Sequence, residues 1–161
     1  MIVVIMGVTG CGKTTIGELL SSKTGIPFHD ADHFHPEANI NKMRDGIALN
    51  DDDRTPWLEV LANLLSKCSV ENGCILACSA LKDKYRKILA NNIQERIYWI
   101  HLEGNFEILK ERLKNRKGHF MNADLLQSQL NILEVPLDFH NLSIEHHPEI
   151  IVQKILEYIK K

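Results

Sequence analysis

Residues 7–14 combine types and a spacing that could hold a chain of phosphates. Their sequence, Gly-Val-Thr-Gly-Cys-Gly-Lys-Thr, fits the pattern G-x-x-x-x-G-K-[ST]. Glycines let backbone N–H groups turn toward phosphate oxygens, and the N-terminus of a following helix attracts the same anion. A Gly-rich turn could match by chance, but Gly is only about 7% of residues in proteins, so such matches are rare. The segment therefore predicts a nucleotide-binding loop formed by Gly7, Thr9, Gly10, Cys11, Gly12, Lys13, Thr14 and Thr15.

An acidic pair follows at the end of the next apolar segment. We expect Asp30 and Asp32 to end a strand over 28–30, and their two-residue spacing puts both on one side of an extended chain. In a parallel sheet the carboxyl ends of strands share one crevice, so both carboxylates should face the loop. Lys13 would then neutralise charge at the β- and γ-phosphates, Thr14 and Asp30 would bind Mg²⁺, and Asp32 would orient an attacking hydroxyl. The alternative is an ordinary turn, because Asp is common at strand ends.

Basic residues near position 115 could complete such a site. Arg112 and Arg116 are four apart and would share a helix face, and Lys117 and His119 follow them. We interpret residues 115–124 as a mobile lid that brings a basic clamp to the transferring phosphoryl group, with Gly118 as its hinge. The alternative is a solvated basic helix.

Alternating strand and helix patterns must position these groups. Strands are expected over 2–6, 28–30, 74–78, 96–102 and 142–144, and helices over 13–23, 37–44, 57–68, 81–91, 105–114, 124–133 and 149–159. Strands separated by helices predict a three-layer α/β sandwich with a five-stranded parallel sheet. Two polar segments, 35–56 and 115–124, are the expected places for substrate binding and closure.

Length, charge and cysteine content narrow the class of protein to which this chain can belong. The chain has 161 residues, which is typical of one domain, and its 19 Lys and Arg against 21 Asp and Glu give a net charge of −2. This balance gives no support for a nucleic-acid partner. No apolar run approaches the roughly 20 residues of a membrane span. The four cysteines lack the spacing of a zinc site or a disulfide framework, so we expect reduced thiols in a cytoplasmic protein.

The segment after the third expected strand separates two kinds of P-loop protein. A GTPase switch would carry D-x-x-G there, whereas this chain has Cys78-Ser79-Ala80. A small-molecule kinase fits better, because it needs an acidic acceptor site beside the loop and a basic lid.

The sequence resembles the gluconokinases, small P-loop kinases that phosphorylate D-gluconate on its 6-hydroxyl with ATP. The resemblance spans nearly the whole chain and rests on D-x-D-x-x-H-P at 30–36, N-D-D-D-R-x-P-W-L at 50–58 and R-x-G-H-F at 116–120, with shorter matches that include Ser128-Gln129. The departures are small: Ala31 stands in place of Gly, Thr9 and Cys11 stand where serine is frequent, and Leu130 replaces an aromatic residue. Shikimate kinases should carry a glycine triplet at 78–80, and nucleoside monophosphate kinases a D-G-x-P-R stretch, and neither is present.

The resemblance implies a nucleoside/shikimate kinase-like fold, ATP and Mg²⁺ as cofactors, and 6-phospho-D-gluconate, which enters the pentose phosphate route, as product. It also implies a cytoplasmic homodimer and places the adenine near His146-His147-Pro148. Catalytic roles are expected for Lys13, Asp32, Arg112 and Arg116, with Arg112 also at the nucleotide.

The gluconate carboxylate calls for a planar cation. Arg54 and Arg86 are both candidates, and analogy with related kinases favours Arg54. Further substrate contacts are expected from Asp32, His35, Lys42, Asp52, Lys82 and His119. For the acidic run 51–53 the alternative is a solvated helix N-terminus. Two other functions stay open: a kinase for another small sugar acid or polyol such as shikimate, and a nucleotide-binding adaptor without catalysis.

Overall fold

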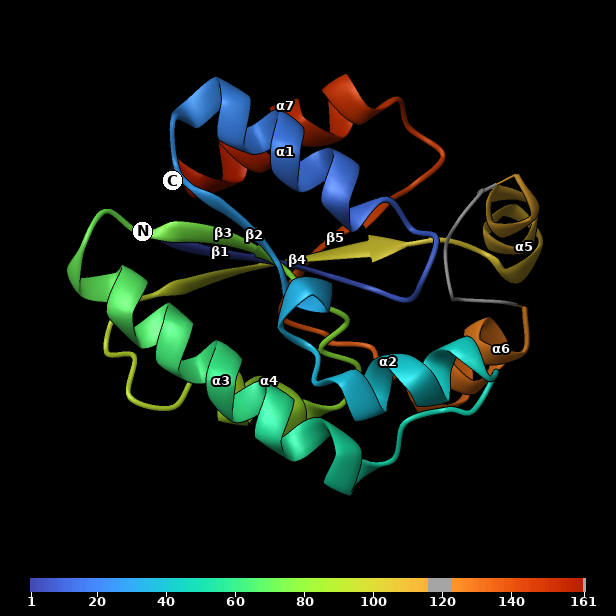
Figure 1. The fold of residues 1–161 in the computed structure, drawn as a ribbon. Coiled ribbons are helices and arrows are strands. Elements are labelled where there is room, and N and C mark those ends of the chain that lie inside the picture. Colours follow the sequence, from blue (N-terminus) through green and yellow to red (C-terminus); the bar gives the residue numbers. More distant parts are fainter. Residues whose placement is uncertain (116–122, 161) are drawn as a thin grey trace.

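Five parallel strands form one sheet in the order β2-β3-β1-β4-β5 (Figure 1). The computed structural model describes residues 1–115 and 123–160. The strands are β1 (Ile2–Met6), β2 (Phe28–Asp30), β3 (Cys74–Ala77), β4 (Ile97–Glu103) and β5 (His140–Ser143). The central strand β1 is fully buried, as its continuous apolar sequence predicted, while the three-residue β2 lies at the edge of the sheet and pairs with β3. The expected five-stranded parallel sheet is confirmed.

Helices cover both faces of the sheet, so the predicted three layers are confirmed. In Figure 1, α1 (Lys13–Thr24) and α7 (Pro148–Ile159) lie on one face, and α3 (Asp51–Val70) and α4 (Asp83–Leu89) lie on the other. The remaining elements gather near the carboxyl ends of the strands: the 3-10 helix η1 (Ala31–Phe34), α2 (Glu37–Arg44), α5 (Phe106–Lys114) and α6 (Ala123–Ile132). No helix within the described parts of the chain has the length and apolar character needed to cross a membrane.

Helix α3 begins six residues earlier than the sequence pattern indicated. The Asn50 side chain accepts a hydrogen bond from the Asp53 N–H at 2.8 Å, and the Asp53 carboxylate accepts one from the Asn50 N–H at 3.0 Å. This reciprocal cap starts the helix at Asp51, so Pro56 lies inside the helix rather than at its start. The prediction that the helix starts at Trp57 was therefore wrong, because it followed the apolar positions of the helix, which begin downstream of the cap.

A close contact fixes α1 against the edge strand. Gly17 lies where a β-carbon would come within 2.2 Å of Cε2 of Phe28, so only a glycine allows this approach. A second contact, apart from the main core, joins the elements around the site: Met43 of α2, Leu49 of the following loop and Leu125 of α6 form a small buried cluster. The carboxyl-end elements are thus packed on one another as well as on the sheet.

Candidate active site

The loop between β1 and α1 has the backbone that a phosphate cradle needs. Gly7 and Gly12 have φ of 144° and 95°, and a β-carbon on Gly7 would lie 2.8 Å from the Leu102 carbonyl oxygen. Gly12 caps α1, whose N-terminal N–H groups face the loop. The Lys13 ammonium lies across the loop and donates to the carbonyls of Gly7 at 3.0 Å and Val8 at 3.1 Å.

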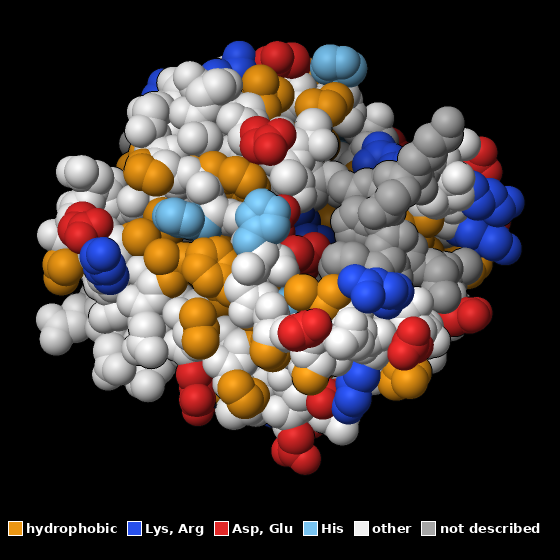
Figure 2. All heavy atoms as spheres, in the orientation of Figure 1, with side chains coloured by type: hydrophobic (Ala, Val, Ile, Leu, Met, Phe, Trp, Pro, Cys, Tyr) orange, Lys and Arg blue, Asp and Glu red, His pale blue; other side chains and the backbone are white. Residues whose placement is uncertain are grey.

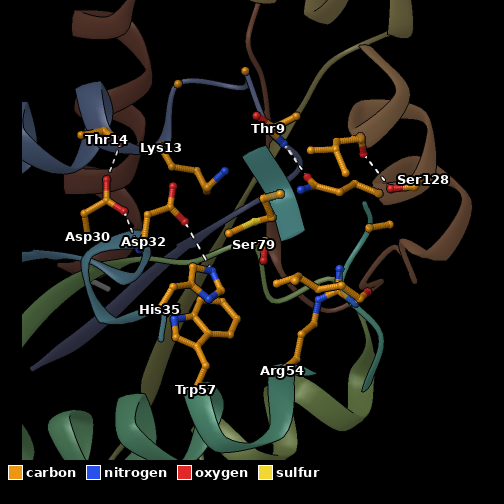
Figure 3. Close-up of a pocket in the computed structure, with 17 residues that line it drawn as sticks. Thr9, Lys13, Thr14, Asp30, Asp32, His35, Arg54, Trp57, Ser79 and Ser128 are labelled. Carbon is orange, nitrogen blue, oxygen red and sulfur yellow. Dashed lines mark hydrogen bonds and ion pairs between the residues drawn. The ribbon is translucent and has the colours of Figure 1, made fainter. Parts of the chain in front are cut away.

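This loop forms one wall of a cavity at the carboxyl ends of the strands (Figure 3). The opposite walls come from η1, α3 and α6, together with α2 and the segment that follows it. The cavity is lined by Thr9, Gly10, Gly12, Lys13, Thr14, Asp30, Asp32, His35, Met43, Ala48, Leu49, Arg54, Trp57, Ser79, Leu125, Ser128 and Gln129.

Both predicted acids face the cavity, but not through an extended chain. The strand ends at Asp30, and Asp32 lies in η1. Asp30 uses one carboxylate oxygen to accept the N–H of Asp32 at 3.0 Å and the other to accept the Thr14 hydroxyl at 2.7 Å. The expectation of an extended segment was wrong because Asp30 caps a 3-10 turn, and that turn still carries Asp32 into the same space (Figure 3).

His35 is held as a neutral ring beside Asp32. It stacks on Trp57 with ring centroids 4.1 Å apart, and Trp57 donates its indole N–H to the Ala31 carbonyl at 2.8 Å. Burial lowers the pKa of His35 to about 4, against the opposite pull of Asp32, whose Oδ1 is 4.0 Å from Nε2. Because the Asn39 amide nitrogen lies 3.4 Å from Nδ1 and can only donate, the ring proton belongs on Nε2. His35 can therefore donate one hydrogen bond toward the acidic side of the cavity.

Arg54 brings a buried positive charge to the far wall (Figure 3). It is 7% exposed, donates to the Leu49 carbonyl, and lies 3.5 Å from the Tyr85 hydroxyl. Within residues 1–115 and 123–160, no carboxylate lies within ion-pair distance of it. A buried guanidinium paired only with neutral groups is suited to an anionic ligand.

Four other expected substrate residues do not line this cavity: Arg86, Lys42, Asp52 and Lys82. Arg86 donates to the carbonyls of Ala80 at 2.9 Å and Leu81 at 3.2 Å, so it supports the loop after β3. Lys42 pairs with Asp53 at 2.7 Å, and the exposed Asp52 lies on the first turn of α3.

Lys82 also forms an ion pair within the protein rather than facing the cavity. It pairs with Asp51 at 3.0 Å, and Asp51 also accepts from Lys84 and Tyr85, contacts that hold its pKa well below the usual range. The acidic run thus forms the first turn of α3, as the alternative interpretation held, with local cations as its partners.

Arg112 lies on a second, separate cavity behind the loop. It donates to the Ile144 carbonyl at 2.8 Å, and this cavity is also lined by Cys11, Gly12, Thr15, His146 and Pro148. Two predicted nucleotide residues, Cys11 and Thr15, therefore line this second cavity and not the cavity of Asp32 and Arg54. The expected lid residues Arg116, Lys117, Gly118 and His119 lie outside the described part of the chain.

Sequence reasoning assigned no catalytic or binding role to four polar or aromatic residues that line the cavity of Asp32 and Arg54, and it took one of them, Trp57, as a packing residue. These are Trp57, Ser79, Ser128 and Gln129. Gln129 accepts a hydrogen bond from the Thr9 N–H at 2.7 Å, so helix α6 contacts the phosphate loop directly. The available signal was the Ser128-Gln129 match within the resemblance, where two polar residues interrupt an apolar helix face.

Comparisons with known proteins match this chain to small-molecule kinases. The sequence model of a family described as shikimate kinase matches residues 9–160. A probable gluconokinase from Dictyostelium discoideum is 46% identical over 173 residues, which cover 99% of this chain and 86% of that protein. A solved sugar kinase from Janibacter sp. HTCC2649 is 41% identical with a TM-score of 0.90, and the match covers 98% of this chain and 93% of that one. A solved gluconokinase from Sinorhizobium meliloti 1021 is 37% identical with a TM-score of 0.88, and the match covers 97% and 89%.

Proposed function

This chain belongs to the gluconokinase family, and from that premise we propose that it transfers the γ-phosphoryl group of ATP to the 6-hydroxyl of D-gluconate. The products are 6-phospho-D-gluconate and ADP. The observation that carries the proposal is a single cavity with a phosphate loop on one wall and the buried Arg54, free of a carboxylate partner among the described residues, on another. A polyol without a carboxylate would leave that guanidinium without a counter-charge.

The phosphate end of the site suits a triphosphate. The N–H groups of residues 10–14 would hold the phosphates, because the Thr9 N–H donates to Gln129. Lys13 would leave its contacts with the Gly7 and Val8 carbonyls to neutralise the β–γ bridge. The second cavity, beside Arg112, His146 and Pro148, would take the adenine. This arrangement agrees with the expected adenine position after β5.

Thr14 and Asp30 are suited to Mg²⁺. A hydroxyl and a carboxylate oxygen lie 2.7 Å apart at the phosphate end of the cavity, and oxygen donors are those that this ion prefers. The described residues contain no group of three or more His, Cys, Asp or Glu side chains able to hold a metal, so water and phosphates would complete the shell. When bound, the ion would neutralise charge on the phosphates.

Gluconate would lie between Arg54 and Asp32. Arg54 would bind the carboxylate, and the Nε2–H of His35 would donate a hydrogen bond to a substrate hydroxyl. The 6-hydroxyl oxygen forms a bond to the γ-phosphorus as the bond from that phosphorus to the β–γ bridging oxygen breaks, and the electron pair leaves with ADP. Asp32 accepts the hydrogen bond of the hydroxyl and takes its proton late, so alignment is its larger contribution.

A coupled ADP-release assay tests this proposal. The wild-type protein should release ADP with D-gluconate and far more slowly with other aldonates, shikimate or no acceptor. Lys13→Ala should lower turnover by roughly a hundredfold or more while leaving the circular dichroism spectrum unchanged. ADP release that prefers shikimate would replace the substrate, and binding of ATP with no turnover on any acceptor would favour the adaptor.

The homodimer and the cytoplasmic location belong to this proposal as well. Val135 and Leu137 are 54% and 92% exposed in the turn before β5, which supports a contact with a second copy. All four cysteines are free and buried, which suits a reducing compartment. Acidic and basic side chains are interspersed on the face in Figure 2, and its described residues form no broad basic field of the kind a nucleic acid would need. Sedimentation equilibrium should give twice the chain mass.

A further inference from the structure

The peptide unit between Val8 and Thr9 is held from both sides. Its carbonyl oxygen, on Val8, accepts from the Lys13 ammonium at 3.1 Å, and its N–H, on Thr9, donates to Oε1 of Gln129 at 2.7 Å. The two side chains that hold it come from elements far apart in the sequence: Gln129 is 120 residues from Thr9. Thr9 and Gln129 are 5% and 7% exposed, so water competes little for this bond.

This peptide lies where the two ends of the cavity meet. Thr9 lies between Gly7 and Gly10, whose φ of 144° and 81° fall in the region that favours glycine. A side chain that restrains the Val8–Thr9 peptide plane therefore fixes the direction of the loop N–H groups that follow it. In this loop, Gln129 supplies that restraint.

Helix α6 is itself anchored to the acceptor side. Its residues Leu125, Ser128 and Gln129 share one face, at i, i+3 and i+4, and all line the cavity. Leu125 packs with Met43 and Leu49, the latter being the residue whose carbonyl accepts from Arg54. A continuous set of contacts therefore runs from the wall that carries Arg54, through α6, to the phosphate loop.

We propose that Gln129 is a positioning residue for phosphoryl transfer: its side-chain amide holds the Val8–Thr9 peptide unit so that the loop N–H groups and Lys13 are aligned with the acceptor wall. This inference rests on the proposed kinase function. It assigns Gln129 an effect on turnover, because misalignment of the loop penalises the transition state more than the binding of either substrate.

The test compares variants at two glutamines of the same helix. Gln129→Met keeps side-chain length and removes the acceptor oxygen, and Gln129→Asn keeps the amide and withdraws it by one methylene. Gln127→Met and Gln127→Asn are the matched controls, because Gln127 is exposed and bonds only to Asn131 in the described contacts. Either Gln129 variant should lower kcat at least tenfold with both KM values within about threefold, and the Gln127 variants should match the parent.

Amide hydrogen exchange at Thr9, followed by NMR, separates this inference from the proposed function. The Thr9 N–H should exchange at least tenfold faster in both Gln129 variants and at the parental rate in the Gln127 controls. Unchanged Thr9 exchange, or unchanged kcat in a folded Gln129 variant, would overturn the inference while leaving the kinase intact. If the wild type phosphorylates no acceptor, the proposed function fails, and the exchange measurement still decides whether Gln129 holds the loop. Should Gln129→Met fail to fold, Gln129→Asn decides alone.

Discussion

Asp32 and Lys13 face the same cavity from different elements, Asp32 from η1 and Lys13 from the start of α1. The place of Lys13 at the phosphate loop could be predicted from the local motif at residues 7–14 alone. Asp32 was correctly predicted to face the loop, but the predicted extended chain was wrong. The chain turns at Asp30 and does not continue as a strand. Its role in catalysis stays a prediction that kinetics must decide.

Asp32→Asn should damage kcat much more than the gluconate KM. The amide keeps the size of the side chain but accepts the hydroxyl hydrogen bond poorly and takes no proton, so the loss falls on the transition state. We expect kcat to fall by about a hundredfold and KM to change less than threefold in steady-state assays. Asp45→Asn, on an exposed residue at the end of α2, is the control. A change confined to KM would reassign Asp32 to substrate binding.

Arg54→Lys should weaken gluconate and spare ATP. Lysine keeps the charge but loses the planar fork that fits a carboxylate and cannot reproduce the bond to the Leu49 carbonyl in the same geometry. We expect the gluconate KM to rise about tenfold or more and the ATP KM to stay within twofold. Arg44→Lys, an exposed change on α2, controls for the substitution itself. Equal weakening of both ligands would place the carboxylate site elsewhere.

At the scale of elements, the sequence pattern predicted what is local and missed what depends on distant partners. The continuous apolar run of β1 and the helix over Glu37–Arg44 were predicted with their observed bounds. The start of α3 was missed because its cap is an exchange of hydrogen bonds between Asn50 and Asp53, which hydrophobic periodicity does not register. Lys42 and Lys82 were expected at the substrate because nothing in their local sequence showed that the first turn of α3 would bind them.

The packing of α1 on β2 gives a prediction for stability. Gly17→Ala improves helix propensity but places a methyl group within 2.2 Å of the Phe28 ring, which packs against the core. We expect a net loss of about 1–3 kcal/mol in the free energy of unfolding, measured with urea. Ser22→Ala, on the exposed side of the same helix, should stay within about 0.5 kcal/mol. A stabilised Gly17→Ala protein would mean that α1 can move away from β2 at little cost.

For the whole molecule, burial of histidines makes stability depend on pH above the range where carboxylates titrate. The pKa of His35 is lowered from 6.5 to about 4, and burial also lowers the pKa of His101. Between those limits the unfolded chain binds more protons than the folded one, so stability is complete above pH 6.5 and falls as pH decreases toward 4. The lowered pKa values of Asp51 and Asp53 add their own loss only below about pH 4.

His35→Asn should therefore reduce the pH dependence of unfolding. From pH 7 to pH 5 the parent should lose about 2 kcal/mol more than the variant, since the 4% exposed ring must stay neutral in the fold. Urea unfolding at the two pH values measures the difference, and His33→Asn on the adjacent exposed residue should follow the parent. Parallel pH profiles for parent and His35→Asn would show that the ring accepts a proton without unfolding.

The position of β2 has a consequence for the diversity of these enzymes. The strand that ends at Asp30, just before Asp32, lies at the edge of the sheet and pairs with β3, whereas the phosphate loop follows the middle strand β1. Chimaeras that exchange residues 28–57 between relatives should therefore inherit the acceptor preference of the donor and keep the nucleotide chemistry of the recipient. Because the acceptor-binding segment can change while the phosphate loop stays the same, one fold can be adapted to many alcohols.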